Sequence, residues 1–102
     1  MIYNQDNITL YVYYKIPTEK HSYYLSAVKN LNDDIQKLYP HLKIKQQKRP
    51  EIDVDNKELW MESYQNVPNI SFEKFKNDLI MLAEKYDMPQ ERKHEIFISM
   101  NI

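Results

Sequence analysis

The side chain best suited to chemistry in this sequence is Glu62, which stands between Trp60 and Tyr64 in an alternating segment. A carboxylate held among aromatic rings, away from water, is the kind of group that acts as a general base. The same carboxylate can instead accept hydrogen bonds from tyrosine hydroxyls and only fix an interface, which is the commoner situation. Glu62 is therefore our candidate catalytic residue, with a structural role as its alternative.

The histidines do not predict a metal site. The sequence has three, His21, His41 and His94, and no two of them have the spacing of metal ligands. His21 and His41 are expected at the surface. His94 shares the parity of the apolar Ile96, so a structural role at a strand end is favoured over ligation. The chain also has no Cys and no Gly, which excludes thiolate chemistry and glycine-rich phosphate loops. We expect no metal and no cofactor.

Four strands and two helices must position these residues. Alternation predicts strands near residues 8–16, 42–48, 58–65 and 93–100, and apolar steps of three and four predict helices near 19–38 and 71–87. The order β-α-β-β-α-β, with right-handed crossovers, predicts a ferredoxin-like α+β fold. Its four-stranded antiparallel sheet has the first and third strands in the centre and both helices on one face. A chain of 102 residues is expected to form a single domain over residues 1–102.

One face of this sheet is left uncovered by the helices. We assign to the helix side the apolar residues Leu10, Val12, Ile44, Leu59, Met61, Ile96 and Ile98. The open face would then carry Tyr11, Tyr13, Lys43, Lys45, Trp60, Glu62, Tyr64, Glu95 and Phe97. Five of these nine are aromatic, whereas a solvated sheet face normally carries small polar and charged side chains. We therefore expect another molecule to cover this face.

Two covers fit the open face. The first is a second copy of the chain, in a homodimer driven by the aromatic residues Tyr11, Tyr13, Trp60, Tyr64 and Phe97. The second is single-stranded RNA, since aromatic side chains on the central strands of this topology stack bases in RNA-recognition domains. The net charge of −1 argues against nucleic acid, whose proteins carry a basic surface. Since no apolar run approaches the length of a membrane helix, we expect a soluble, cytoplasmic homodimer that does not bind membranes.

Three motifs resemble the strand motifs of a small family of uncharacterised bacterial proteins. They are Tyr13-Tyr14-Lys15-Ile16, Trp60-Met61-Glu62-Ser63-Tyr64 and Arg92-Lys93-His94-Glu95-Ile96-Phe97. That family is similar to the dimeric α+β barrel superfamily, which includes antibiotic-biosynthesis-type monooxygenases, haem-degrading enzymes and stress-responsive proteins. Because the family has no assigned activity, the resemblance implies a fold and a dimer rather than a reaction.

Three functions follow from these features. A dimeric binding or interaction module ranks first, with Tyr11, Tyr13, Trp60, Glu62, Tyr64 and Phe97 as its interface or ligand-binding residues. A cofactor-independent oxidation of a small aromatic substrate ranks second, with Glu62 as base and tyrosine hydroxyls as donors to a developing oxyanion. An RNA-binding domain ranks third. The sequence offers no nucleophile, metal site or phosphate loop that would favour an enzyme.

Overall fold

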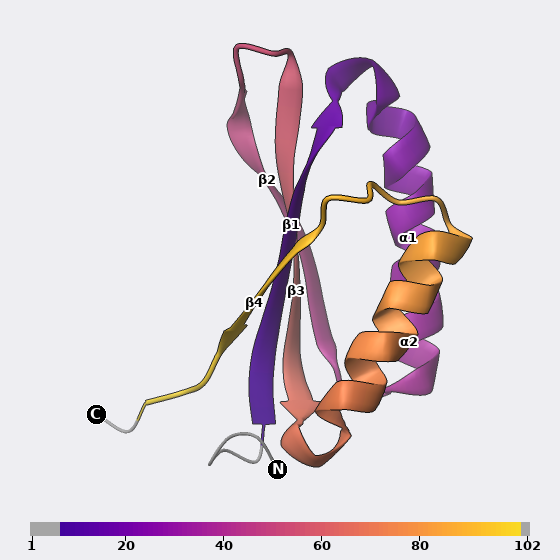
Figure 1. Cartoon of the computed structure of the whole chain (residues 1–102), viewed down its shortest axis with the longest axis vertical. Coiled ribbons are helices and arrows are strands. Elements are labelled where there is room, and N and C mark those ends of the chain that lie inside the picture. Colours follow the sequence, from indigo (N-terminus) through magenta and orange to yellow (C-terminus); the bar gives the residue numbers. More distant parts are fainter. Residues whose placement is uncertain (1–6, 101–102) are drawn as a thin grey trace.

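The computed structural model describes residues 7–100 as one sheet and two helices (Figure 1). The elements in chain order are β1 (Asn7–Pro17), α1 (His21–Leu38), β2 (Lys43–Ile52), β3 (Lys57–Pro68), α2 (Phe72–Lys85) and β4 (Lys93–Phe97). A short 3-10 turn leads into each helix, at Thr18–Lys20 and at Asn69–Ser71. The strands lie in the order β2-β3-β1-β4 and all neighbours are antiparallel. The predicted ferredoxin-like fold, with the first and third strands in the centre, is confirmed.

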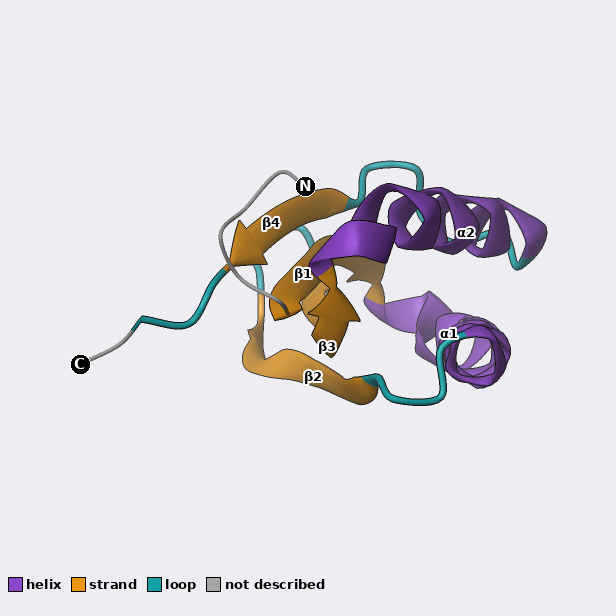
Figure 2. Ribbon diagram, turned by 90° about the horizontal axis from the view of Figure 1, so that it is seen from below, coloured by secondary structure: helices purple, strands orange, loops and turns teal. Residues whose placement is uncertain are grey.

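Both helices cover the same face of the sheet, as predicted (Figure 2). The buried residues of α1 are Ala27, Val28, Leu31 and Ile35, and those of α2 are Phe72, Phe75, Leu79 and Ala83. Steps of three and four place each set on one side of its helix. They pack against the alternate residues Leu10, Val12, Tyr14 and Ile16 of β1, which are at most 2% exposed. The hydrophobic core therefore lies between the helices and the sheet.

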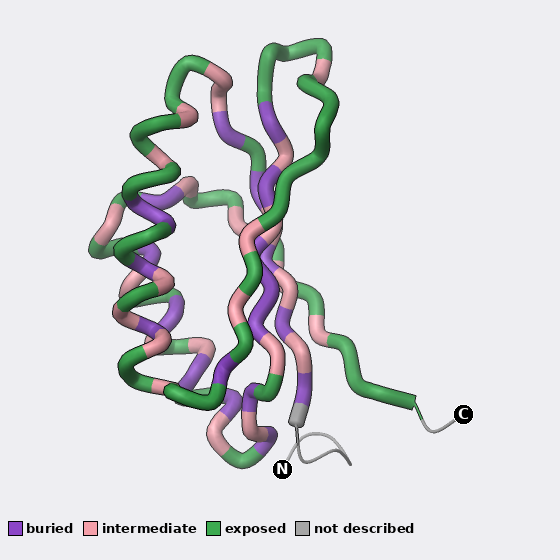
Figure 3. The backbone as a smooth tube through the Cα atoms, turned by 180° about the vertical axis from the view of Figure 1, so that it is seen from behind, coloured by how far each residue is buried: buried purple, intermediate pink, exposed green. Residues whose placement is uncertain are grey.

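The register of β3 differs from the prediction. Tyr14 pairs with Trp60, Val12 with Glu62 and Leu10 with Tyr64. Directly paired residues point to the same face of a sheet. Trp60, Glu62 and Tyr64 therefore lie on the helix side and are at most 2% exposed. Figure 3 shows that the buried parts of the chain lie along the middle of the sheet and on the sides of the helices that face it.

The prediction that these three residues occupy the open face was wrong, and so was the placing of Leu59 and Met61 on the helix side. Leu59 and Met61 are only partly buried and lie on the open face. The physical reason is area, because an indole and a phenol ring each bury about 150–250 Å². Burial of a carboxylate between them is tolerated because, as shown below, it has charged and hydroxyl partners inside the core.

A bulge resets the alternation at the end of β3. The pairing with β1 shifts between Ile8 and Leu10, so that Ile8 pairs with Val67 although Leu10 pairs with Tyr64. Asn66 lies in this extra stretch with φ of 66°, a left-handed conformation that Asn adopts more readily than most residues. Tyr64 and Val67 both reach the core as a result, and both are fully buried.

Two strands have other lengths than predicted. β2 continues to Ile52, through Pro50, because an edge strand tolerates a residue that has no N–H to donate. β4 ends at Phe97 rather than at residue 100. Ile98, predicted on the helix side, lies beyond this strand and is 46% exposed. Within residues 7–100, no helix is both long and apolar enough to cross a membrane.

Candidate functional site

A buried polar cluster surrounds the Glu62 carboxylate. Arg92 donates from Nη1 to Oε2 over 2.8 Å and from Nη2 to Oε1 over 2.9 Å, which is the bidentate geometry of a strong ion pair. The Tyr14 hydroxyl donates to Oε2 over 2.5 Å, and the Tyr64 hydroxyl donates to Oε1. The Glu62 side chain is fully buried and that of Arg92 is 8% exposed. Four hydrogen bonds therefore fill the acceptor positions of this carboxylate.

Three strands and one loop bring this cluster together. Tyr14 comes from β1, Glu62 and Tyr64 come from β3, and Arg92 immediately precedes β4. The Arg92 guanidinium also lies over the Tyr14 ring, 4.9 Å from its centroid, where a cation is attracted to the aromatic face. Gln46 of β2 adds its Nε2, 3.5 Å from the Tyr14 hydroxyl. The cluster thus links β1, β2 and β3 to the segment that leads into β4.

The electrostatics keep the two hydroxyls and the guanidinium of the cluster protonated. Burial and the Glu62 charge raise the pKa of both Tyr14 and Tyr64 well above the ordinary value, so both hydroxyls keep their protons and donate. Burial lowers the pKa of Arg92, but its hydrogen bonds with Glu62 outweigh this and raise the pKa above its usual range. One positive and one negative charge remain, and they compensate each other.

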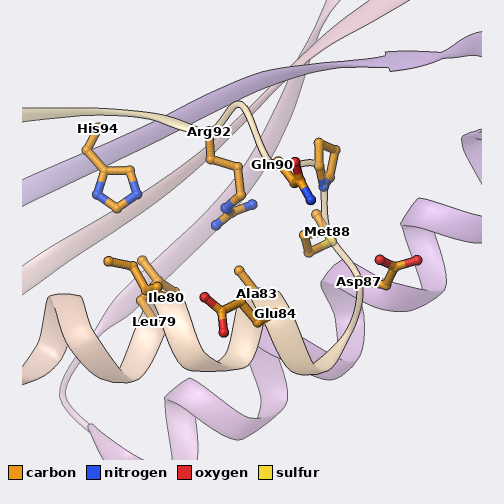
Figure 4. Close-up of a pocket in the computed structure, with 10 residues that line it drawn as sticks. Leu79, Ile80, Ala83, Glu84, Asp87, Met88, Gln90, Arg92 and His94 are labelled. Carbon is orange, nitrogen blue, oxygen red and sulfur yellow. The ribbon is translucent and has the colours of Figure 1, made fainter.

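A cavity of about 630 Å³ lies between α2, the segment that follows it, and the start of β4. Its apolar lining consists of Leu79, Ile80, Ala83, Met88 and Pro89, and its polar lining of Glu84, Asp87, Gln90, Arg92 and His94. Figure 4 shows the Arg92 and His94 side chains directed from the β4 side toward α2. Arg92 therefore lines the cavity and also binds Glu62, which does not line it.

His94 is the histidine in the lining of this cavity. It pairs with Val12 on the helix side of the sheet and is partly buried. Burial and the neighbouring Arg92 charge lower its pKa, and Lys76 acts in the same direction, while Glu62 opposes them. The imidazole is therefore neutral at pH 7, with one nitrogen as donor and one as acceptor.

This pKa shift predicts a pH dependence of stability. Below about pH 6.5, the ordinary pKa of histidine, the unfolded chain binds a proton at His94 before the folded chain does. The stability present above that pH is therefore lost as the pH falls toward the lower pKa of the folded state. His94→Gln should reduce this loss in urea unfolding between pH 7.5 and 5, whereas His41→Gln, at an exposed loop position, should not. An unchanged slope in His94→Gln would contradict the assignment.

A second buried carboxylate, Glu58, lies at the other end of β3. Its Oε1 accepts from Trp60 Nε1 over 3.0 Å and from His21 Nδ1 over 2.8 Å, and Lys48 Nζ lies 3.8 Å away. Burial raises the pKa of Glu58, but the hydrogen bonds from Trp60 and His21 outweigh it and hold the pKa below its ordinary value. Glu58 thus fastens the first turn of α1 to β3. The half-exposed His21 has this buried partner, which its position in the sequence did not suggest.

The six predicted site residues fall into two groups on opposite faces of the sheet. Trp60, Glu62 and Tyr64 lie in the core, as described above. Tyr11, Tyr13 and Phe97 lie on the open face, where the Tyr11 and Phe97 rings meet edge to face with centroids 5.2 Å apart. The Tyr13 hydroxyl donates to Glu95, its diagonal neighbour on β4. No single site contains all six residues.

Sequence reasoning missed Arg92 and the cavity, and it missed the partners of Glu58. The available signal was the pair Glu58 and Glu62, four residues apart on one face of a strand, since two buried carboxylates require donors from elsewhere. Among residues 7–100, no group of three or more His, Cys, Asp or Glu side chains is placed to hold a metal ion.

No family model matches the chain, and no curated protein matches it in sequence. Solved structures do match. A putative antibiotic biosynthesis monooxygenase from Nitrosomonas europaea has a TM-score of 0.60 at 13% identity, over 98% of this chain and 96% of that one. A variant of SnoaB, a cofactor-independent oxygenase from Streptomyces nogalater, has 0.58 at 12%, over 96% and 97%. A dimeric ferredoxin-like protein of unknown function from Thermobifida fusca has 0.59 at 11%, over 95% of both chains.

The similarities to these solved structures establish the fold of the chain. The chain shares the ferredoxin-like fold with these proteins. At identities this low, the shared property is the fold, and the chemistry must be argued from this chain's own residues.

Proposed function

We propose that the chain is a homodimeric binding protein that holds a small, largely apolar molecule in the cavity between α2 and β4. The observation that carries this proposal is the cavity of about 630 Å³, which has apolar walls and the polar side chains of Arg92 and His94 on its sheet side. Its volume lies within the roughly 300–1,000 Å³ of small-molecule sites, and its combination of apolar walls and few polar groups is typical of them.

The charges around the cavity favour a neutral ligand over an anionic one. Arg92 is compensated by Glu62, with which it forms two hydrogen bonds. His94 is neutral at pH 7. The uncompensated charges of the lining are then the exposed carboxylates of Glu84 and Asp87. A flat apolar molecule with a hydroxyl group fits this arrangement, since His94 and Gln90 can each accept or donate a hydrogen bond.

This proposal predicts that 2-naphthol binds and that filling the cavity prevents it. Ala83 is 8% exposed and lines the cavity, so Ala83→Leu should weaken binding at least tenfold in calorimetry, by occupying the space of the ligand. Met81→Leu is the matched control, because Met81 lies on the same helix, is 66% exposed and is not part of the lining.

The same titration with 2-naphthoate tests the charge argument. The repulsion between the ligand carboxylate and a nearby Glu84 or Asp87 carboxylate costs about 1 kcal/mol of binding free energy even in water. The affinity for 2-naphthoate should therefore be about fivefold lower than that for 2-naphthol. Absence of naphthol binding, or equal binding by Ala83→Leu, would contradict the ligand site.

The open face supports the dimer. Phe97 is 54% exposed there, beside Tyr11, and the partly buried Leu59 and Met61 extend the apolar surface across β3. A contiguous apolar surface of this kind marks an interaction site. The Thermobifida fusca protein, which has the same fold, is dimeric, and this agrees with the proposal.

Oxidation of an aromatic substrate is the second candidate function, and two of the solved structures are named as oxygenases. Binding ranks above it for a geometric reason. Glu62 does not line the cavity, and its acceptor positions are filled by Arg92, Tyr14 and Tyr64. We therefore assign to Glu62 an organising role rather than that of a general base.

A further inference from the structure

His21, the first residue of α1, is held in one orientation by two residues of β3. Its Nδ1 lies 2.8 Å from Glu58 Oε1, and its ring meets the Trp60 indole edge to face, with the ring centroids 5.3 Å apart. Trp60 Nε1 donates to the same Glu58 oxygen over 3.0 Å. The imidazole, the carboxylate and the indole therefore form one group of side chains in mutual contact.

The hydrogen bond to Glu58 decides which nitrogen of His21 carries the hydrogen. Glu58 is 3% exposed, and its carboxylate is ionised at pH 7 because its hydrogen bonds outweigh the effect of burial on its pKa. An ionised carboxylate can only accept, so Nδ1 must donate, and Nε2 of the neutral ring keeps a free lone pair. The His21 side chain is 40% exposed, and Nε2 lies on the side of the ring away from the buried carboxylate.

This arrangement suits a nucleophile. Within residues 7–100, nothing hydrogen-bonds to Nε2, and no group of three or more His, Cys, Asp or Glu side chains is placed to bind a metal ion with it. A carboxylate on Nδ1–H orients an imidazole and stabilises the imidazolium that forms when the other nitrogen reacts. Glu58 is in the position to do both for His21.

A lysine beside the same carboxylate selects the charge of the reagent. Lys48 Nζ lies 3.8 Å from Glu58 Oε1, and its side chain is 45% exposed. An ion pair this long and this exposed is weak, so the ammonium group of Lys48 is available to a second anion. Lysine binds phosphate oxygens as a point charge. The lone pair of His21 and the charge of Lys48 together fit a small phosphorylated reagent.

We propose that His21 accepts a phosphoryl group on Nε2 from an acyl phosphate, with Glu58 as the positioning residue. The lone pair of Nε2 attacks phosphorus, the P–N bond forms, and the bond from phosphorus to the acyl oxygen breaks. The carboxylate of the reagent leaves with that electron pair. The hydrogen stays on Nδ1, and Glu58 compensates the positive charge of the ring. His21 does not line the cavity between α2 and β4, so this site is separate from the ligand site proposed above.

The test compares His21 with His41 in the same molecule. Acetyl phosphate is added at about pH 8, above the ordinary histidine pKa of about 6.5, and peptide mapping by mass spectrometry follows phosphoryl transfer to each residue. His41, exposed in the loop between α1 and β2, is the unassisted reference. In the folded protein His21 should react about tenfold faster than His41. In urea the two rates should become equal, because the contact with Glu58 is lost.

Two variants separate the contributions of Glu58 and Lys48. Glu58→Gln keeps an acceptor but not the charge, so the rate at His21 should fall about tenfold in a protein whose far-ultraviolet circular dichroism matches the wild type. Lys48→Met should slow transfer from acetyl phosphate about fivefold and leave the reaction with diethyl pyrocarbonate, a neutral electrophile, unchanged. Lys29→Met, at an exposed position of α1, is the matched control and should change neither rate.

Three outcomes would count against the proposal. A rate at His21 no higher than at His41 in the folded wild type would overturn it and leave Glu58 as a structural partner alone. Acetyl transfer to Lys48 in place of phosphoryl transfer to His21 would overturn it as well. Equal slowing of both reagents in Lys48→Met would show that Lys48 does not bind the phosphoryl group.

Discussion

Arg92→Met is expected to lower the free energy of unfolding by about 3–5 kcal/mol, because it leaves the Glu62 carboxylate buried without a counter-charge. The Glu62 side chain is fully buried, and Arg92 supplies two of its four hydrogen bonds. Urea unfolding followed by far-ultraviolet circular dichroism measures the loss. Arg49→Met is the matched control, since Arg49 is the other arginine of the chain and is exposed on β2; its effect should stay within about 0.5 kcal/mol.

The double variant Arg92→Met with Glu62→Gln isolates the cause. Glutamine has no charge and keeps a side-chain oxygen that can accept from the Tyr14 or Tyr64 hydroxyl. Most of the stability lost in Arg92→Met should therefore return when Glu62→Gln is added, although the second change also removes a native side chain. If the double variant is less stable than the single one, the ion pair is not what makes Arg92 important.

The strand order and the helices could be predicted because their signals are local. In β1 one parity is entirely apolar or aromatic, from Ile8 to Ile16, and the other contains Thr9 and Lys15, so its buried face is unambiguous. The core residues of both helices recur at steps of three and four. These patterns suffice to specify a ferredoxin-like fold.

β3 could not be oriented in the same way, because both of its parities carry large apolar side chains. Leu59 and Met61 compete with Trp60 and Tyr64, and Glu62 argued for exposure of the second set. Trp60, Glu62 and Tyr64 face the core instead because Arg92, thirty residues away from Glu62, compensates its charge there. A local pattern contains no information about a partner so distant in sequence.

The cavity was unpredictable for a related reason. It forms where α2 ends and the chain returns to β4, and its lining combines one side of a helix with an irregular segment. Periodicity describes helices and strands, but it does not describe how such a segment packs. His94 was correctly placed on the helix side, yet its parity did not reveal that a cavity lies in front of it.

Because Trp60 lies in the core, its replacement should cause a second large loss of stability. Trp60→Ala should lower the free energy of unfolding by about 3–5 kcal/mol, since it removes a buried indole. It also takes a hydrogen bond away from Glu58, which is 3% exposed. Trp60→Phe keeps most of the ring but not the Nε1–H, so it should cost less and should weaken the hold of Glu58 on α1. Thermal and urea unfolding of the three proteins measure these differences.

The contrast with Phe97 decides whether Trp60 acts in the core or at an interface. Trp60 is 2% exposed on the helix side, whereas Phe97 is 54% exposed on the open face. Trp60→Phe should therefore reduce the free energy of unfolding without changing the dissociation constant of the proposed homodimer. Phe97→Ser should weaken the dimer and change the unfolding of the monomer little, because its ring is already half in water. Should Trp60→Phe dissociate the dimer at full monomer stability, the indole would belong to the interface, and the pairing of Trp60 with Tyr14 on the helix side would have to be reversed.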